Sequence, residues 1–116
     1  MPHEHAPMTA EMEQCIQNCQ DCHRVCLETI AHCLQMGGPH ADPGHIKLMQ
    51  DCVQICQTSA DFMTRMSPHH PHVCRECSEI CAECAKDCQS MGDDPMMKSC
   101  AEACRTCAES CRKMAA

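Results

Sequence analysis

The sequence predicts an all-α protein, an antiparallel up-down-up-down four-helix bundle with a cysteine-lined core. Three observations lead to this fold class. Cysteines recur at alternating spacings of three and four residues, which place them on one face of an α-helix. Segments containing glycine or proline divide the 116-residue chain into four such stretches. These breaks are short, and short connections make consecutive helices antiparallel neighbours.

We expect the first helix at about residues 9–36. Thr9 followed by Glu11 is typical of a helix start, and the segment Gly37-Gly38-Pro39 is typical of a helix end. The cysteines between these limits are spaced by four, three, four and seven residues: Cys15, Cys19, Cys22, Cys26 and Cys33.

The second helix is expected at about residues 43–66. Asp42 precedes Pro43, which places a capping carboxylate before a proline at the first helical position. This helix contains only two cysteines, Cys52 and Cys56. Three other residues stand at positions where further thiols could have continued the stripe: Met49, Ser59 and Met63.

The third and fourth helices are expected at about residues 72–91 and 95–113. Asp94 and Pro95 repeat the capping arrangement of the second helix. The third helix carries Cys74, Cys77, Cys81, Cys84 and Cys88. The fourth carries Cys100, Cys104, Cys107 and Cys111. Each helix is therefore amphipathic, with sulfur on its apolar face.

Composition narrows the class of protein. Sixteen of the 116 residues are cysteine, well above the ~8–10% that marks a special class. Only a dozen residues are Ile, Leu, Val or Phe, which with a net charge of −7 would normally indicate disorder. The helical spacing of the cysteines excludes that interpretation. We expect residues 1–8 to form a flexible N-terminal arm and residues 9–116 to form a single metal-binding domain.

Charge and hydropathy argue against nucleic-acid binding, a membrane location and secretion. The chain has no basic block and one aromatic residue of the Phe, Trp and Tyr group, so we expect no nucleic-acid partner. It contains no apolar stretch long enough for a membrane helix. The first residues lack the cationic start and apolar run of a secretory signal. We therefore expect a cytoplasmic protein, whose thiols are kept reduced.

Closing four such stripes on each other makes a thiol-lined tube. We expect two neighbouring levels, one with Cys22, Cys56, Cys81 and Cys104, the other with Cys26, Cys52, Cys84 and Cys100. Thiolates bind soft Cu(I), which accepts two or three sulfurs, whereas Zn(II) requires four ligands in a tetrahedron. The pattern favours Cu(I), with a capacity of roughly 16 ions if each thiol binds one.

The chain resembles the bacterial copper storage proteins, and in particular their cytosolic branch. Three cysteine runs carry the resemblance: Cys15-Cys19-Cys22-Cys26, Cys74-Cys77-Cys81-Cys84-Cys88 and Cys100-Cys104-Cys107-Cys111. The resemblance implies storage and buffering of Cu(I) by these cysteines and a homotetramer. The repeated, similar cysteines form no catalytic constellation, so we expect no enzymatic activity. The implied partners are copper ions and a copper chaperone or small-thiol copper carrier. The second helix departs from the pattern because it has only two cysteines.

Methionine and histidine gather at both ends of the predicted tube. Thioethers bind Cu(I) weakly and need no deprotonation, which suits a site where ions enter and leave. The resemblance favours the end formed by the first and third loops, with these candidate residues: Met36, His40, His45, Met49, Met91, Met96 and Met97. His23 and His32 lie off the cysteine stripe, and we expect no metal role for them.

Three other functions fit a cysteine-rich chain. A thiol oxidoreductase needs one cysteine made distinct by a low pKa and exposure, whereas these cysteines are alike in pattern. A disulfide scaffold suits a secreted chain, and cysteines three or four residues apart on one helix face are poor partners for each other. A general soft-metal buffer for Zn(II) or Cd(II), like a metallothionein, is the alternative that titrations with Cu(I) and Zn(II) would distinguish.

Overall fold

The computed structural model describes residues 8–115, which form four α-helices and one short 3-10 helix. The elements are α1 (Ala10–Met36), η1 (Gly38–Ala41), α2 (Pro43–Thr64), α3 (His70–Gln89) and α4 (Pro95–Met114). The predicted fold class is confirmed. Most of the predicted N-terminal arm lies outside the described residues; Met8, its last residue, packs half-buried against the core.

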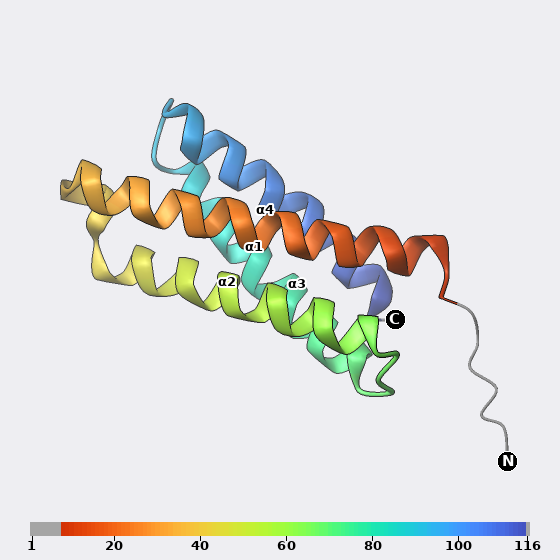
Figure 1. The fold of residues 1–116 in the computed structure, drawn as a ribbon. Helices are drawn as coiled ribbons and strands as arrows, with labels where there is room; N and C mark the ends of the chain where they lie inside the picture. Colours follow the sequence, from red (N-terminus) through yellow and green to blue (C-terminus); the bar gives the residue numbers. More distant parts are fainter. Residues whose placement is uncertain (1–7, 116) are drawn as a thin grey trace, which may run out of the picture.

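The helices run alongside one another in an up-down-up-down order (Figure 1). α1 packs against α2 and α4, and α3 packs against the same two helices, so α1 and α3 lie diagonally across the bundle. The α1–α2 and α3–α4 connections lie at one end, which we call the η1 end. The α2–α3 connection lies at the opposite end, together with the start of α1 and the end of α4.

The helix starts follow the predicted caps. The Thr9 hydroxyl accepts a hydrogen bond from the Met12 backbone N–H at 3.1 Å. The Asp42 carboxylate accepts from the Gly44 and His45 N–H groups at 3.1 and 3.3 Å. Asp94 caps α4 in the same manner. Because a capping side chain replaces a hydrogen bond that the first turn lacks, each start is set locally.

The ends of the middle helices differ from the prediction. α2 ends at Thr64, and α3 begins at His70, two residues before the predicted start, and ends at Gln89. Pro71 is accommodated because the first turn of a helix does not need its N–H. The 3-10 turn η1 was not predicted. It begins at Gly38, and the φ angles of Gly37 and Gly38, 69° and 57°, reverse the chain direction in a conformation that glycine favours.

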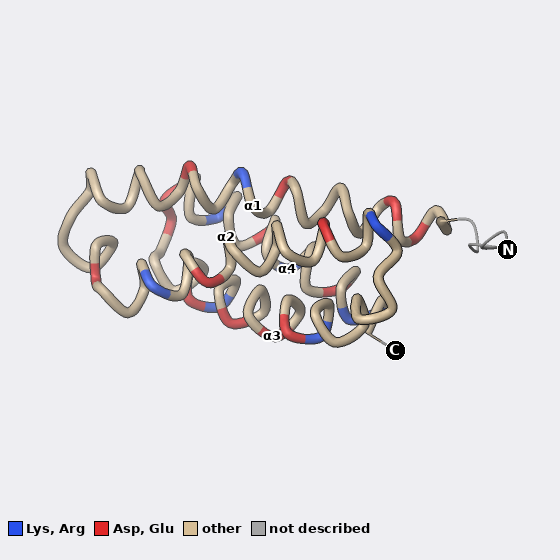
Figure 2. Tube along the Cα trace, turned by 60° about the horizontal axis from the view of Figure 1, so that its bottom comes forward, with Lys and Arg blue, Asp and Glu red and all other residues tan. Residues whose placement is uncertain are grey.

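Charged side chains lie on the outside of the bundle. Figure 2 shows acidic and basic residues interspersed along the helices. Apart from partly exposed Asp87, the charged residues of α3 and α4 are exposed, for example Glu79, Glu83 and Arg105. Within residues 8–115, no helix is long and apolar enough to cross a membrane.

Replacing Asp42 with alanine should lower the free energy of unfolding of the reduced, metal-free protein by about 1 kcal/mol. The substitution removes both cap hydrogen bonds at the start of α2. Urea unfolding under anaerobic conditions measures the change. Asp51→Ala is the matched control, because Asp51 is an exposed residue in the middle of α2. An equal loss of stability in both variants would contradict the capping role.

Candidate metal centre

The cysteines form the core of the bundle. All sixteen are free thiols with an exposed fraction of 0%. Their inward direction follows from the spacing of three and four residues, which keeps successive side chains on one helix face. Non-cysteine residues complete the same stripes, and the fully buried ones are Thr29, Met49, Ser59, Met63 and Met97. The predicted cysteine-lined core is confirmed.

Sulfur atoms touch along most of the length of the bundle. An unbroken path of contacts between 3.5 and 4.0 Å crosses repeatedly between helices, in the order Cys15, Cys111, Cys107, Cys56, Cys81, Cys52, Cys26, Cys100 and Cys88. No aliphatic side chain interrupts this path. The core is therefore a continuous sulfur column, and a soft metal ion anywhere in it has several sulfur neighbours.

Cysteines four residues apart on one helix also touch each other. The Sγ atoms are 3.9 Å apart in Cys22–Cys26, 3.8 Å in Cys77–Cys81 and 4.0 Å in Cys107–Cys111. These separations are as short as those between helices. For this reason the two predicted levels are not separate layers. Cys52, predicted for one level, contacts Cys22 at 3.8 Å and Cys81 at 3.6 Å in the other.

Four sets of four cysteines bring their Sγ atoms within 4.8 Å of one another. The sets are Cys19, Cys77, Cys107 and Cys111; Cys22, Cys26, Cys52 and Cys104; Cys22, Cys52, Cys56 and Cys81; and Cys56, Cys77, Cys81 and Cys107. Several members belong to two sets. Independent four-ligand ions therefore cannot fill all four sets at once, whereas ions bridged by shared thiolates can.

The pKa values of the thiols oppose simultaneous ionisation. Hydrogen bonding with neighbouring thiols, first with Cys104, lowers the pKa of Cys22. Interactions with neighbouring thiols, first with Cys100 and then with Cys22, raise the pKa of Cys104. Near the η1 end, burial and neighbouring negative charges raise the pKa of Cys33 to about 11. The pKa values of neighbouring thiols therefore shift in opposite directions, so the thiols do not all ionise together, and Cu(I) binding must release the protons that remain.

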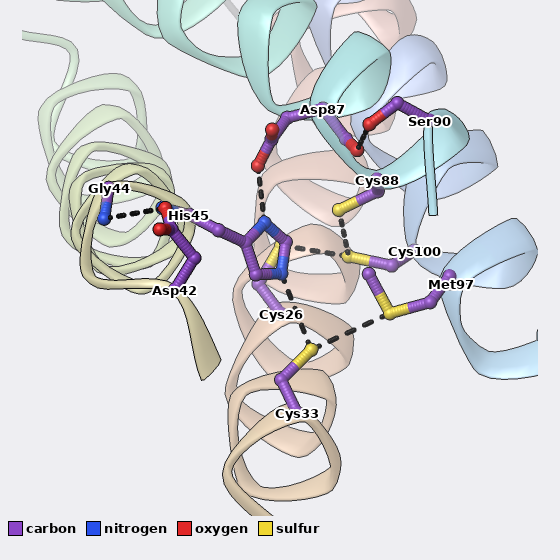
Figure 3. Close-up of polar contacts among 10 residues, drawn as sticks. All are labelled: Cys26, Cys33, Asp42, Gly44, His45, Asp87, Cys88, Ser90, Met97 and Cys100. Carbon is purple, nitrogen blue, oxygen red and sulfur yellow. Dashed lines mark hydrogen bonds and ion pairs between the residues drawn. The ribbon is translucent and has the colours of Figure 1, made fainter. Parts of the chain in front are cut away.

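His45 lies at the η1 end of the sulfur column, between an acid and a thiol (Figure 3). Its Nε2 atom is 3.3 Å from the Cys33 sulfur, and its Nδ1 atom contacts the Asp87 carboxylate. The Met97 sulfur is 3.6 Å from the same Cys33 sulfur. His45 is the one buried histidine among residues 8–115. This end of the column thus combines thiol, thioether and imidazole groups.

The seven residues predicted as the place where copper enters differ in their positions. His45, Met49 and Met97 are buried at the end of the column. His40 and Met91 are half-buried. Met36 and Met96 are exposed, with exposed fractions of 56% and 38%. The structure therefore brings three of the seven into the core.

Sequence analysis missed two polar contacts of this end. Asp87 was not a candidate, because its contact with His45 depends on how α2 and α3 are rotated about their axes. His32, for which no metal role was expected, contacts Asp94 at 2.6 Å. His23 is bound to the backbone oxygen of Val53 at 2.9 Å and has no part in the column. No local sequence signal predicts contacts between residues so far apart in the chain.

Fold and core together define a class of helical bundles that bind soft metal through buried thiols. The model of the copper storage protein family matches residues 8–116, and the chain belongs to that family. This agrees with the resemblance found in the cysteine runs. None of the curated proteins matches the chain significantly.

Solved structures are similar over nearly the whole chain. A protein from Nitrosospira multiformis is 46% identical, with a TM-score of 0.85, and the match covers 90% of this chain and 94% of that one. Cu(I)-bound copper storage protein BsCsp3 is 37% identical, with a TM-score of 0.84 and coverage of 91% and 99%. A cytosolic copper storage protein from Streptomyces lividans, with five coppers, is 26% identical, with a TM-score of 0.78 and coverage of 90% and 92%.

The raised pKa of Cys33 should lower the free energy of unfolding at high pH. Below its usual pKa of 9.0, Cys33 is protonated in both states. Between that value and about 11, the unfolded chain loses the proton while the folded chain keeps it, so stability is lost as pH rises. Urea unfolding of the reduced, metal-free protein at about pH 8 and pH 10.5 measures this loss. Cys33→Ser should lose less stability over the same range, and equal losses would contradict the assignment.

Proposed function

We propose that this protein stores Cu(I) as thiolate-bound ions in its core, at roughly one ion per cysteine when full. The observation that carries the proposal is the unbroken path of sulfur contacts through the core. Membership in the copper storage protein family supports the choice of metal. The Cu(I)-bound structure of the 37% identical relative supports it further.

The sharing of sulfurs among neighbouring sets suits bridged Cu(I) better than isolated Zn(II). Spacing alone does not distinguish the two metals, because tetrahedral ligation with ~2.3 Å bonds also places sulfurs about 3.8 Å apart. With metal–sulfur bonds of ~2.3 Å, sulfurs around one three-coordinate ion lie about 4 Å apart, and those around a linear ion about 4.6 Å. The observed separations of 3.5 to 4.0 Å need only a small expansion to reach either value. At most two of the four-cysteine sets can be filled without sharing a member, so separate tetrahedral Zn(II) ions in these sets would leave half of the sixteen thiols unused.

Further proposals concern the activity, location, oligomeric state and copper donor of the protein. We propose that the protein has no enzymatic activity, because its cysteines are uniformly buried and none is exposed for reaction with a substrate. A cytoplasmic location is supported by the relative described as cytosolic. A homotetramer follows from the resemblance, and exposed Leu27 and Leu34 on α1 supply apolar surface for packing. A copper chaperone or small-thiol copper carrier is the proposed donor.

We propose that copper enters at the η1 end, where His45 meets Cys33. Binding requires Cys33 to lose a proton, which burial disfavours. His45 Nε2, 3.3 Å away, can accept that proton as the ion arrives. Asp87, in contact with the other ring nitrogen, stabilises the resulting imidazolium. The buried thioethers of Met49 and Met97 provide neutral ligands that hold an ion during its passage.

Anaerobic titration of the reduced protein with Cu(I) should level off at roughly 16 ions per chain, with about one proton released per ion. Ultraviolet thiolate-to-copper absorbance follows the binding, and the thiols remaining free are counted after denaturation. Cys22→Ser/Cys52→Ser should reduce capacity, whereas Ser59→Ala is a matched control that leaves every thiol in place. A plateau at three or four ions, or tight uptake of four or five Zn(II) with sparse Cu(I), would contradict storage of Cu(I).

Replacing His45 with alanine should slow Cu(I) uptake by about tenfold or more, because the Cys33 thiol loses its proton acceptor. Stopped-flow absorbance with a thiol-carried Cu(I) donor measures the rate. Capacity at equilibrium should not change. Asp87→Asn, which keeps a similar shape, should slow uptake less, and His72→Ala at the opposite end should have no effect. Uptake by His45→Ala at the wild-type rate would place the route elsewhere.

A further inference from the structure

A second group of metal-ligating side chains lies outside the sulfur column. His32 of α1, His40 of η1 and Asp94, the N-cap of α4, direct one ligand atom each to within 4.8 Å of one another. His32 Nε2 is 2.6 Å from Asp94 Oδ2, and His40 Nε2 is 3.5 Å from the same oxygen. All three side chains are mostly covered, with exposed fractions of 21%, 17% and 15%. The group contains no sulfur.

The fold holds these three groups in place from separate elements. Gly37 and Gly38 reverse the chain after α1, so η1 folds back and His40 reaches His32, with ring centres 6.0 Å apart. Asp94 Oδ1 accepts the hydrogen bond that caps α4, from Met96 N–H at 2.9 Å. This fixes the carboxylate and leaves Oδ2 for the two imidazoles. The C-terminal end of α1 and the start of α4 lie at the same end of the bundle (Figure 1).

Hydrogen bonding alone does not account for the group. His32 has a hydrogen bond to Asp94, but His40 Nε2 is enclosed by protein and has no hydrogen-bond partner. A buried polar atom without a partner is costly, and most such atoms in native proteins are satisfied. A metal ion beside Asp94 would give His40 Nε2 the partner that it lacks.

The ligand chemistry differs from that of the core. Two imidazole nitrogens and one carboxylate oxygen suit a borderline divalent ion such as Zn(II), whereas Cu(I) prefers the thiolates and Mg(II) prefers oxygen. We propose that His32, His40 and Asp94 form a Zn(II) site separate from the copper store. Three protein ligands leave a fourth position for water. A bound ion joins α1, η1 and α4 and so fastens the η1 end of the bundle.

The test uses the full-length reduced protein after anaerobic loading with Cu(I), which occupies the competing thiols. A thiol count after denaturation checks that loading separately. Zn(II) is then added, and bound metal is measured after removal of free ions and by calorimetry. We expect about one Zn(II) per chain. His32→Ala/His40→Ala should abolish this uptake, and Asp94→Asn should weaken it more than about tenfold while keeping a residue that can cap α4.

His69→Ala/His72→Ala is the matched control, because it also removes two histidines, at the opposite end of the bundle. This variant should take up Zn(II) like the wild type. Zn(II) should raise the melting temperature of the wild type and the control but not of His32→Ala/His40→Ala. Absence of Zn(II) uptake by the wild type, or equal uptake by His32→Ala/His40→Ala, would overturn the site.

Co(II) in place of Zn(II) identifies the ligands and keeps the two proposals distinguishable. At the proposed site it should give visible d–d bands without the near-ultraviolet charge-transfer band of thiolate ligation. A Co(II) complex that shows that band and survives His32→Ala/His40→Ala would overturn the site. If the thiols remained free after Cu(I) loading, the proposal of copper storage would be contradicted. In that case, loss of the thiolate-free Co(II) signal in His32→Ala/His40→Ala would still support the histidine site.

Discussion

The spacing of three and four residues between inward-facing side chains is the constraint on which this structure depends. It places about one inward-facing side chain per helical turn on each helix, in most turns a sulfur, and antiparallel packing brings four such rows together. Because the rise per turn is ~5.4 Å, sulfurs on one helix are only slightly farther apart along the axis than sulfurs facing each other across the bundle. The observed contacts within and between helices fall in the same range, from 3.5 to 4.0 Å. The sulfurs therefore form one continuous column and not a series of separate four-ligand sites.

The two ends of the continuous sulfur column differ in their chemistry. Coupling among thiols means that each ionisation opposes the next, so ions can accumulate only if protons leave. Met12 and Met63 close the column toward the α2–α3 end with apolar thioethers. The η1 end instead has His45 in contact with both Cys33 and Asp87. His45 accepts protons at this end and contacts the partly exposed Asp87 carboxylate. This pair provides a route by which protons leave, which the remainder of the core lacks.

Local features of the sequence were sufficient to predict the helices. They were not sufficient to predict contacts between residues that are far apart in the chain. The cysteine runs and the Asp42-Pro43 and Asp94-Pro95 pairs predict helices and starts, because caps and periodicity act within one turn. The early start of α3 at His70 was missed because Pro71 was taken to lie outside the helix. The pairs His45–Asp87 and His32–Asp94 join residues 42 and 62 positions apart. Such contacts depend on helix rotation and on the path of η1, which no pattern in the sequence specifies.

The composition of the core also bears on how the empty and filled states differ. Cysteine is small, and the large side chains that are fully buried are the methionines Met49, Met63 and Met97. Isoleucine and leucine are at most partly buried, so the metal-free core has little of the aliphatic burial that usually stabilises a bundle. A metal that binds only the folded arrangement adds its binding free energy to folding. The thiol core therefore makes the stability of the bundle depend on the ions that it contains, with the capped helix starts holding the empty state together until they arrive.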